Sequence, residues 1–303
     1  MLAFLQKIIA ALLSMTALFT GAFRIQWDDR MAGHDFPLIE AGEKAEGDLR
    51  VMSMNVRCED NNGVPRVARK HLVVKEILKL RPDSLGVQEA TPEWMLSLQA
   101  DLPEYGSVGV ARDNGKSVFR WGESCAIFYL REKLELLDHG DFWLSETPDE
   151  PSVYPGAGCN RVCTWALFRV KATGQTYLHV NTHFDNASAE ARVFGARLIC
   201  DRLNGIHPDT PTVLTADMNS GSYGQAYRVM TDRLPDAALT AADAVTYGTF
   251  HDCDPETNAD CVLDYILCSD DVTVNVFRVV TDGIEGRFVS DHFPLYADVA
   301  LPA

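Results

Sequence analysis

The sequence is poor in basic residues and has no cationic stretch. Its 303 residues include 27 Lys and Arg against 43 Asp and Glu, which gives a formal net charge of −16. No cluster of Lys and Arg with interleaved aromatic residues is visible. A chain this acidic repels polyphosphate at long range, so we expect no tight non-specific binding to duplex nucleic acid. A pocket can still reverse the field locally by holding a cation, and carboxylates are suited to that task.

The sequence also lacks internal repeats and, between residues 49 and 301, any stretch rich in Gly, Ser and Pro. Hydrophobic residues make up 47% of the chain and charged residues 23%, which excludes a disordered or collagen-like protein. An α/β fold of roughly 200–250 residues often forms one unit, so we expect a single domain over residues 49–301. Residues 24–48 are polar and without a clear period, and are interpreted as a linker.

No CxxC pair occurs among the eight cysteines, which disfavours a structural zinc site. Two pairs are nevertheless close in sequence, Cys159 with Cys163 and Cys253 with Cys261. The second pair flanks a polar loop that a disulfide would clip in an oxidising compartment. A disulfide and two thiols remain alternatives for both pairs.

The first 23 residues have the layout of a targeting segment. One basic residue, Lys7, precedes an apolar run over 8–19, and small residues follow at 20–22. This layout predicts a signal peptide or an N-terminal anchor. The protein would then be secreted, periplasmic or anchored in a membrane. The alternative is a buried first helix of the domain.

Short β-type runs alternate with helical patterns from Leu49 onward. Helices are predicted over 67–80 and 187–203, and a third opens at Thr91-Pro92, where Thr is suited to the N-cap and Pro to the first turn. The predicted strands cover 49–56, 84–89, 125–130, 134–145, 161–170, 177–185, 212–219, 262–269, 274–280 and 290–301. Because several strands follow one another without a helix between them, we expect an α/β domain of two stacked mixed sheets with helices outside.

The predicted strands repeatedly end in a carboxylate, an amide or an imidazole. These residues are Asn55, Glu89, His183 with Asp185, Asp217 with Asn219, Asp264, and Asp291 with His292. Each alone is explained as a turn residue or a buried hydrogen-bonding group. Six such places together favour a site, because a strand end is a rigid mount for a reacting group. The ligand types are hard oxygens with few sulfurs, which suits Mg²⁺ or Mn²⁺.

These segments resemble the endonuclease/exonuclease/phosphatase (DNase I-like) superfamily of metal-dependent phosphoesterases, and most closely its bacterial secreted or anchored branch. The likeness spans about residues 49–301 and includes SMNVR, GVQE, RVCTWALF, NTHFDN, LTADMN, TYGTFHD, LDYIL and SDHFPLYADV in the family's order. It implies a four-layer sandwich, with two mixed sheets packed face to face and helices outside. One departure is Ala216 in place of the Gly of the family's GDxN motif.

The resemblance implies that Glu89 holds Mg²⁺ or Mn²⁺, aided by Asn55 and Asp291. The cation would neutralise charge on the phosphate. Arg161 is a candidate fork for the phosphate, with an exposed surface arginine as the alternative.

The remaining residues would handle water and the phosphoryl group. Asp217 orients and deprotonates the attacking water, and Asn219 faces the same way two residues on in an extended segment. His292 meets the phosphate and is oriented by Asp264. His183 donates to the phosphoryl oxygens, and together with Asn219 it contacts the substrate. Since Asp291 and His292 are adjacent, both roles require a turn, which Phe293-Pro294 permits.

The predicted function is metal-dependent hydrolysis of a phosphate mono- or diester by an activated water. The substrate would be a small molecule, a lipid headgroup or a short nucleotide, and the protein a monomer. Two alternatives remain: a nuclease acting on DNA or RNA, and a catalytically inactive binding protein of the same fold.

Overall fold

The structure is a computed structural model that describes residues 29–58 and 66–302. The predicted targeting segment, residues 1–23, and the first part of the predicted linker lie outside the described residues. Within the described ranges, no helix has the length and apolar character needed to cross a membrane.

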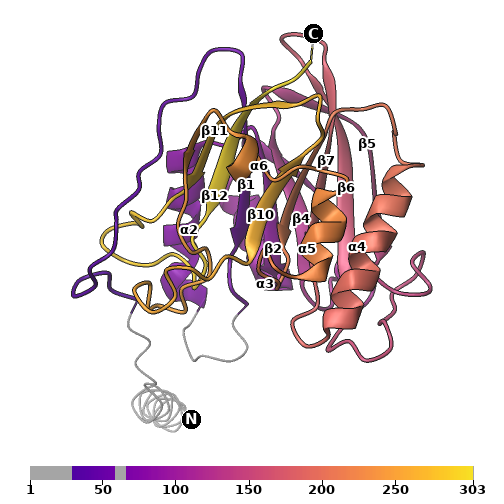
Figure 1. The fold of residues 1–303 in the computed structure, drawn as a ribbon, viewed down its shortest axis with the longest axis horizontal. Coiled ribbons are helices and arrows are strands. Elements are labelled where there is room, and N and C mark those ends of the chain that lie inside the picture. The colour runs from indigo at the N-terminus through magenta and orange to yellow at the C-terminus, as the bar shows by residue number, and fades with distance from the viewer. Residues whose placement is uncertain (1–28, 59–65, 303) are drawn as a thin grey trace, which may run out of the picture.

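The described chain forms two mixed β-sheets, as the sequence predicts (Figure 1). One sheet has seven strands in the order β3-β4-β2-β1-β12-β11-β9, and the other has five in the order β10-β8-β7-β6-β5. The strands are β1 (Leu49–Asn55), β2 (Ser84–Ala90), β3 (Tyr105–Val108), β4 (Ser124–Leu130), β5 (Leu134–Trp143), β6 (Val162–Val170), β7 (Thr176–His183), β8 (Thr212–Asp217), β9 (Asp243–Val245), β10 (Asp264–Cys268), β11 (Thr273–Val279) and β12 (Leu295–Ala300).

Helices cover the outer faces of both sheets, which completes the four predicted layers (Figure 1). Helices α2 (Arg66–Leu80) and α3 (Pro92–Asp101) pack on the seven-stranded sheet, and α4 (Ala189–Leu203) and α5 (Gln225–Thr231) on the five-stranded one. A short helix, α6 (Ala237–Thr240), precedes β9. The central core lies between the sheets. Every residue of β1 is therefore buried, as expected for a strand covered on both faces.

The long predicted elements are confirmed, and the missed ones are short. Strands β3 and β9 have four and three residues, and helices α5 and α6 have seven and four. Thr91 is the N-cap of α3, with its side chain accepting a hydrogen bond from Trp94 N, as the Thr-Pro pair predicts. No disulfide joins Cys159 to Cys163 or Cys253 to Cys261.

Residues 29–48, interpreted from the sequence as linker, pack on the domain instead. Phe36 stacks on Phe288 at 5.9 Å between ring centroids and lies 5.8 Å from Phe293. The backbone N–H of Ile39 donates to Thr281 Oγ1 at 2.8 Å. This segment contacts residues more than 200 positions away, so its place on the domain was not legible from local sequence.

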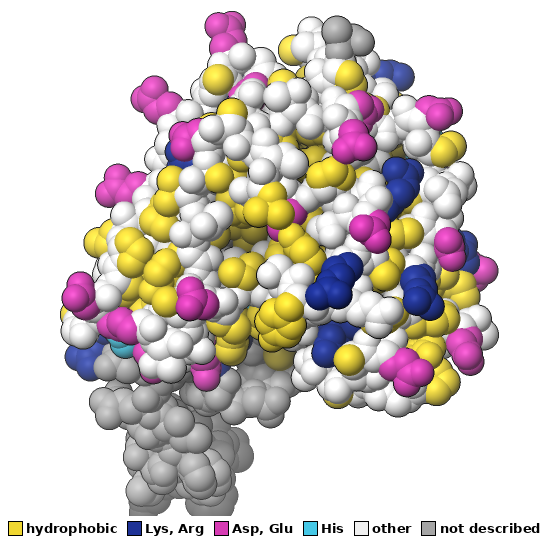
Figure 2. Space-filling view, in the orientation of Figure 1, with side chains coloured by type: hydrophobic (Ala, Val, Ile, Leu, Met, Phe, Trp, Pro, Cys, Tyr) yellow, Lys and Arg dark blue, Asp and Glu magenta, His cyan; other side chains and the backbone are white. Residues whose placement is uncertain are grey.

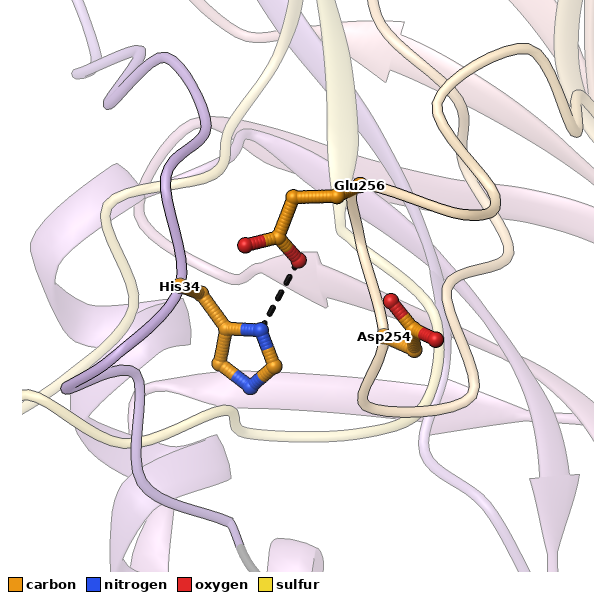
Figure 3. Close-up of side chains that lie close together, drawn as sticks. All are labelled: His34, Asp254 and Glu256. Atoms are coloured by element: carbon orange, nitrogen blue, oxygen red, sulfur yellow. Dashed lines mark hydrogen bonds and ion pairs between the residues drawn. The ribbon is translucent and has the colours of Figure 1, made fainter.

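Exposed hydrogen bonds also join the same segment to the loop before β10 (Figure 3). His34 Nδ1 lies 2.8 Å from Glu256 Oε2, and Asp35 N donates to Glu256 Oε1 at 2.5 Å. Asp254 lies beside them, so these three residues form a trio of possible metal-ligating groups. Asp254 and Glu256 are exposed. The hydrogen bonds of Glu256 attach the segment to the loop, and they account for the closeness of His34 and Glu256.

Candidate active site

The polar strand ends of the two sheets meet at one edge of the sandwich. His183 and Asp217 end the parallel neighbours β7 and β8 and are paired in register. Asp264, the first residue of β10, pairs with Asp217 from the other side. Asn55 ends β1 on the facing sheet and contacts Asp217 directly. Strand ends from both sheets thus supply one cluster, as the sequence predicts.

The amide of Asn55 connects two carboxylates across the sheets. Its Nδ2 donates to Glu89 Oε1 at 3.0 Å and to Asp217 Oδ2 at 2.9 Å. Its Oδ1 accepts from Arg57 N at 2.9 Å, so that the amide oxygen is engaged within its own loop. The amide nitrogen of Asn55 thus faces both carboxylates, and its oxygen faces Arg57 N.

Glu89 and Asn219 reach the site through left-handed backbone conformations, with φ of 58° and 46°. Glu89 lies where the register of β2 with β4 shifts between Val87 and Ala90. Asn219 follows β8 in a turn in which its N–H donates to Asp217 Oδ1 at 2.9 Å. The prediction of an extended segment over 217–219 is therefore wrong.

His292 is held by Asp264 on a loop before β12. Its Nδ1 lies 2.8 Å from Asp264 Oδ2, and its Nε2 lies 3.9 Å from Asp217 Oδ2. Asp264 N and Leu263 N both donate to Thr249 Oγ1, which fixes the start of β10. The strand predicted over 290–301 begins only at Leu295, and the chain bends over residues 289–291 ahead of it.

His183 faces Asn219 and Asp217. Its Nε2 accepts from Asn219 Nδ2 at 2.8 Å, and the same amide nitrogen donates to Phe184 O. This geometry places the ring proton on Nδ1, which is buried without a hydrogen-bond partner. The pKa of His183 is held well below its usual value by burial first, and then by Arg161, Arg112 and His292. A neutral imidazole thus keeps one buried N–H available to a ligand.

Arg161 is buried beside His183 and is not the exposed surface arginine of the alternative interpretation. Its Nη2 donates to Asn186 Oδ1 at 3.1 Å and its Nε lies 3.6 Å from Asp185 Oδ2, whereas Nη1 is buried without a hydrogen-bond partner. A cavity of about 10 Å³, close to the room one water needs, is lined by Arg161, Arg112 and His183. Glu123, which pairs with Arg112 at 2.7 Å, also lines this space, so the cavity at the predicted site carries groups of both signs.

The acids of the cluster differ in how firmly they hold a proton. Burial raises the pKa of Asp217 to about 7, and the charge of Asp264 adds to the rise. Burial also acts to raise the pKa of Glu89, but the hydrogen bonds from Cys58 N and Asn55 and the charge of His292 bring it below its usual value. For His292, burial lowers the pKa, yet Asp264, Asp217 and Asp291 together raise it well above the ordinary range.

The donor groups fit a divalent cation at the Glu89 side of the cluster. Glu89, His183 and Asp217 each offer an atom within 4.8 Å of the others, and Asp217, Asp264 and His292 form a second such group. Carboxylates that crowd together in a buried space repel one another, and a bound cation relieves that repulsion. Asp291 belongs to neither group, because it faces Arg57 Nη1 at 3.5 Å. The structure therefore does not bring Asp291 into the predicted metal set.

Sequence reasoning missed two arginines beneath the site. Arg57 is buried against Asp291, and Arg69 of α2 is buried with its guanidinium donating to the carbonyls of Val56 and Arg57. The signal for Arg57 was its place two residues after Asn55, but Arg69 lies inside a helical pattern that carries no such signal.

Several proteins of known family or structure are similar to this chain. A model of the Endonuclease/Exonuclease/phosphatase family matches residues 52–292. An endonuclease/exonuclease/phosphatase from Bacteroides vulgatus is 35% identical, with a TM-score of 0.79, and the match covers 84% of this chain and 99% of that one. A mannosyl-6-phosphatase from Bacteroides thetaiotaomicron is 31% identical, with a TM-score of 0.78, over 84% of this chain and 100% of that one. Protein angel of Drosophila melanogaster is 26% identical over 75% of this chain and 72% of its own length.

Proposed function

The chain belongs to the endonuclease/exonuclease/phosphatase family, and from this premise we propose that it is a divalent-metal-dependent phosphoesterase that hydrolyses phosphate mono- or diesters. The observation that carries the proposal is the cluster in which Asn55 links Glu89 to Asp217 while Asp264 holds His292. In the reaction a water oxygen bonds to phosphorus, the ester P–O bond breaks, and the departing oxygen takes up a proton.

Asp217 is the residue placed to orient and deprotonate the attacking water. Its Oδ2 is contacted by Asn55 and lies near the imidazoles of His183 and His292. A pKa raised to about 7 suits a general base, because a base works best when its pKa lies near the working pH.

The two histidines are placed to bind the phosphoryl oxygens, His292 as a protonated imidazolium and His183 as a neutral imidazole. His292 is kept protonated by Asp264 and can donate from Nε2, while neutral His183 can donate from its unpartnered Nδ1. Arg161 adds further buried N–H groups beside His183. Such fixed donors stabilise charge that develops in the transition state.

Mg²⁺ or Mn²⁺ would be held by Glu89, with Asp217 beside it. When bound, the cation neutralises the charge that builds on the phosphate. Asn55 would join as an oxygen ligand only if its amide turned over, since its NH₂ group faces both carboxylates in this structure.

The test measures release of p-nitrophenol from p-nitrophenyl phosphate and from bis-p-nitrophenyl phosphate with Mg²⁺. Glu89→Gln and Asp217→Asn should each lose on the order of 10²–10⁴ in rate, the scale for a general base or a charge-stabilising group. EDTA should abolish turnover of the wild type, and added Mg²⁺ or Mn²⁺ should restore it.

Glu132→Gln is the matched control, because the ion pair of Glu132 with Arg81 is exposed and lies away from the cluster. Its rate should equal that of the wild type. Turnover that survives EDTA, or a fully active Asp217→Asn enzyme, would contradict the proposal. Absence of turnover on both esters would favour the inactive binding protein instead.

A further inference from the structure

Exposed apolar side chains gather on the loop between β3 and β4 and on neighbouring α3. Val118, Phe119 and Trp121 of the loop are 66%, 90% and 74% exposed, and Leu96 of α3 is 69% exposed. These four residues, the apolar patch, are four of the ten exposed large hydrophobic residues in the described part of the chain. Leu96, Val118 and Phe119 line one groove of about 360 Å³. Single exposed apolar residues are normal, but a concentration of this kind marks an interaction surface.

Hydrogen bonds fix the backbone of this loop. Asn114 Nδ2 donates to Phe119 O at 2.8 Å, and Asn114 Oδ1 accepts from Trp121 N at 3.2 Å. At the base of the loop, Arg112 N donates to Glu123 O at 2.9 Å. Phe119 itself has a left-handed backbone, with φ of 54°, which costs an aromatic residue free energy. The fold therefore holds the ring of Phe119 out in solvent on a defined turn.

The loop lies at the same edge of the sandwich as the catalytic cluster. Strand β4 begins at Ser124, which pairs with Ala90, the residue after Glu89. Glu123, the last residue before β4, lines the small cavity that His183 also lines. A surface that binds the apolar patch is therefore bound at the end of the molecule that carries the cluster.

The charges around the apolar patch are basic, in contrast to the chain as a whole. Between Asp113 and Glu123 the loop carries Lys116 and Arg120 and no acidic residue. The two flanking acids face Arg112, at 4.0 Å from Asp113 and 2.7 Å from Glu123. Lys116 is exposed, and Arg120 lines the groove. The part of the loop that protrudes thus combines aromatic rings with positive charge.

The acids of neighbouring α3 do not cancel this local charge. Asp101 pairs with Lys70 at 3.0 Å, and Glu93 does not line the groove. The net charge of −16 comes from the whole chain, and salt screens distant charges beyond about 8 Å at an ionic strength of about 0.15 M. A binding surface therefore responds to Lys116 and Arg120 first.

The composition of the apolar patch fits a lipid surface. Trp and Phe side chains favour the boundary between lipid headgroups and acyl chains, where an apolar phase covers the rings. Lys and Arg beside such rings are attracted to anionic headgroups. Rings that protrude on a turn can enter this layer without a matching pocket on the other side.

We propose that the apolar patch is a docking surface for a lipid membrane with anionic headgroups. Phe119 and Trp121 enter the boundary of the acyl chains, while Lys116 and Arg120 contact the headgroup phosphates. The inference goes beyond the proposed function, because docking requires neither a metal nor turnover.

The test uses the full chain and vesicles of phosphatidylcholine and phosphatidylglycerol in equal parts, with bromine atoms on the acyl chains to quench tryptophan fluorescence. Trp121→Phe keeps an aromatic ring in the apolar patch and removes the reporter, so its difference from the wild type reports Trp121 alone. The wild type should lose a larger share of its fluorescence than Trp121→Phe. Any lipid contact of the predicted targeting segment contributes to both proteins and cancels.

Two substitutions separate the apolar and the charged contributions, each compared with the same variant carrying Trp121→Phe. Phe119→Ser should raise the lipid concentration for half-maximal quenching of Trp121 about tenfold, the scale of one ring kept in water. Lys116→Ser should raise it about fivefold, the scale of one cation near an anionic membrane. For the wild type, vesicles of phosphatidylcholine alone should require about tenfold more lipid.

Leu239→Ser is the matched control, because Leu239 is also exposed but lies on α6, outside the apolar patch. Its quenching curve should equal that of the wild type. Equal quenching of the wild type and Trp121→Phe overturns the inference. A wild-type dimer in light scattering that Phe119→Ser dissociates also overturns it, since the apolar patch would then bind a second copy of the chain. Equal quenching with and without phosphatidylglycerol overturns the assignment to anionic headgroups.

Discussion

At the residue scale, buried polar side chains between the two sheets form a network of hydrogen bonds. His179 lies between the sheets, with Nδ1 3.0 Å from Ser84 Oγ and Nε2 3.0 Å from Thr215 Oγ1. Thr215 Oγ1 in turn bonds Asn181 Oδ1, which accepts from Gln88 Nε2 at 2.7 Å. A chain of hydrogen bonds therefore crosses the sandwich just behind Glu89. Satisfied buried networks of this kind fix one register of the sheets.

His179→Gln should flatten the dependence of stability on pH between 5.5 and 7.5. Burial lowers the pKa of His179 to about 3, against 6.5 in the unfolded chain. The unfolded chain thus binds a proton below pH 6.5 that the folded chain does not, so stability is full above pH 6.5 and falls as pH drops toward 3. At pH 5.5 this group alone should cost the wild type about 1.4 kcal/mol.

Urea unfolding of both proteins at pH 5.5 and 7.5 checks this prediction through the difference in the two pH effects. His139→Gln is the control, because His139 is exposed and the variant should keep the wild-type pH dependence. An identical pH effect in wild type and His179→Gln would show that His179 is not held neutral by burial.

At the scale of elements, the segment over 29–48 shows where local patterns stop being informative. The long strands and helices could be predicted, because the apolar run of β1 and the apolar stripe of α4 are visible within the segments themselves. Phe36 belongs to a short stretch without a strand or helix period, and its partners Phe288 and Phe293 lie some 250 positions away. Strand β9 was missed for a related reason, since its three exposed residues gain strand geometry only by pairing with β11.

Phe36→Ala should destabilise the domain by about 1–3 kcal/mol, because it removes a partly buried ring from the aromatic cluster that includes Phe288, Phe293 and His251. Leu38→Ala on the same segment is the control: Leu38 is 64% exposed, and its variant should stay within about 0.5 kcal/mol of the wild type. The measurement is the free energy of unfolding in urea. Equal stability of the two variants would mean that the segment rests on the surface without contributing to the fold.

At the scale of the whole molecule, the sequence indicated which residues form the site, but not the contacts between them. Those contacts depend on the order and stacking of the sheets. The sequence predicted which polar residues gather at the site, since each lies at or near one end of a recognisable strand. Contacts such as Asn55 to Asp217 join strands of facing sheets 162 residues apart, so their geometry depends on how the sheets stack. The left-handed conformations of Glu89 and Asn219 arise at a register shift between β2 and β4 and in the turn after β8, and local sequence patterns did not indicate them.

Charge is arranged unevenly over the same molecule. Figure 2 shows acidic side chains spread over the visible face, while Lys and Arg are more frequent on the side of α4 and α5. Hydrophobic side chains also surround a hollow near the middle of this face. Tyr227, Leu239 and Val279 line a pocket of about 270 Å³. Neither feature forms the continuous basic track that a nucleic-acid backbone requires.

A 20-base-pair DNA duplex should therefore show no saturable binding below about 100 µM at 150 mM salt, the weak end of non-specific binding. The reason is the net charge of −16, which a single bound cation at Glu89 offsets only locally. Fluorescence anisotropy with labelled duplex and the Asp217→Asn variant in Mg²⁺ measures binding while suppressing cleavage. Micromolar affinity that falls steeply with added salt would contradict this expectation, and plasmid nicking by the wild type would then favour a nuclease over an enzyme for small phosphate esters.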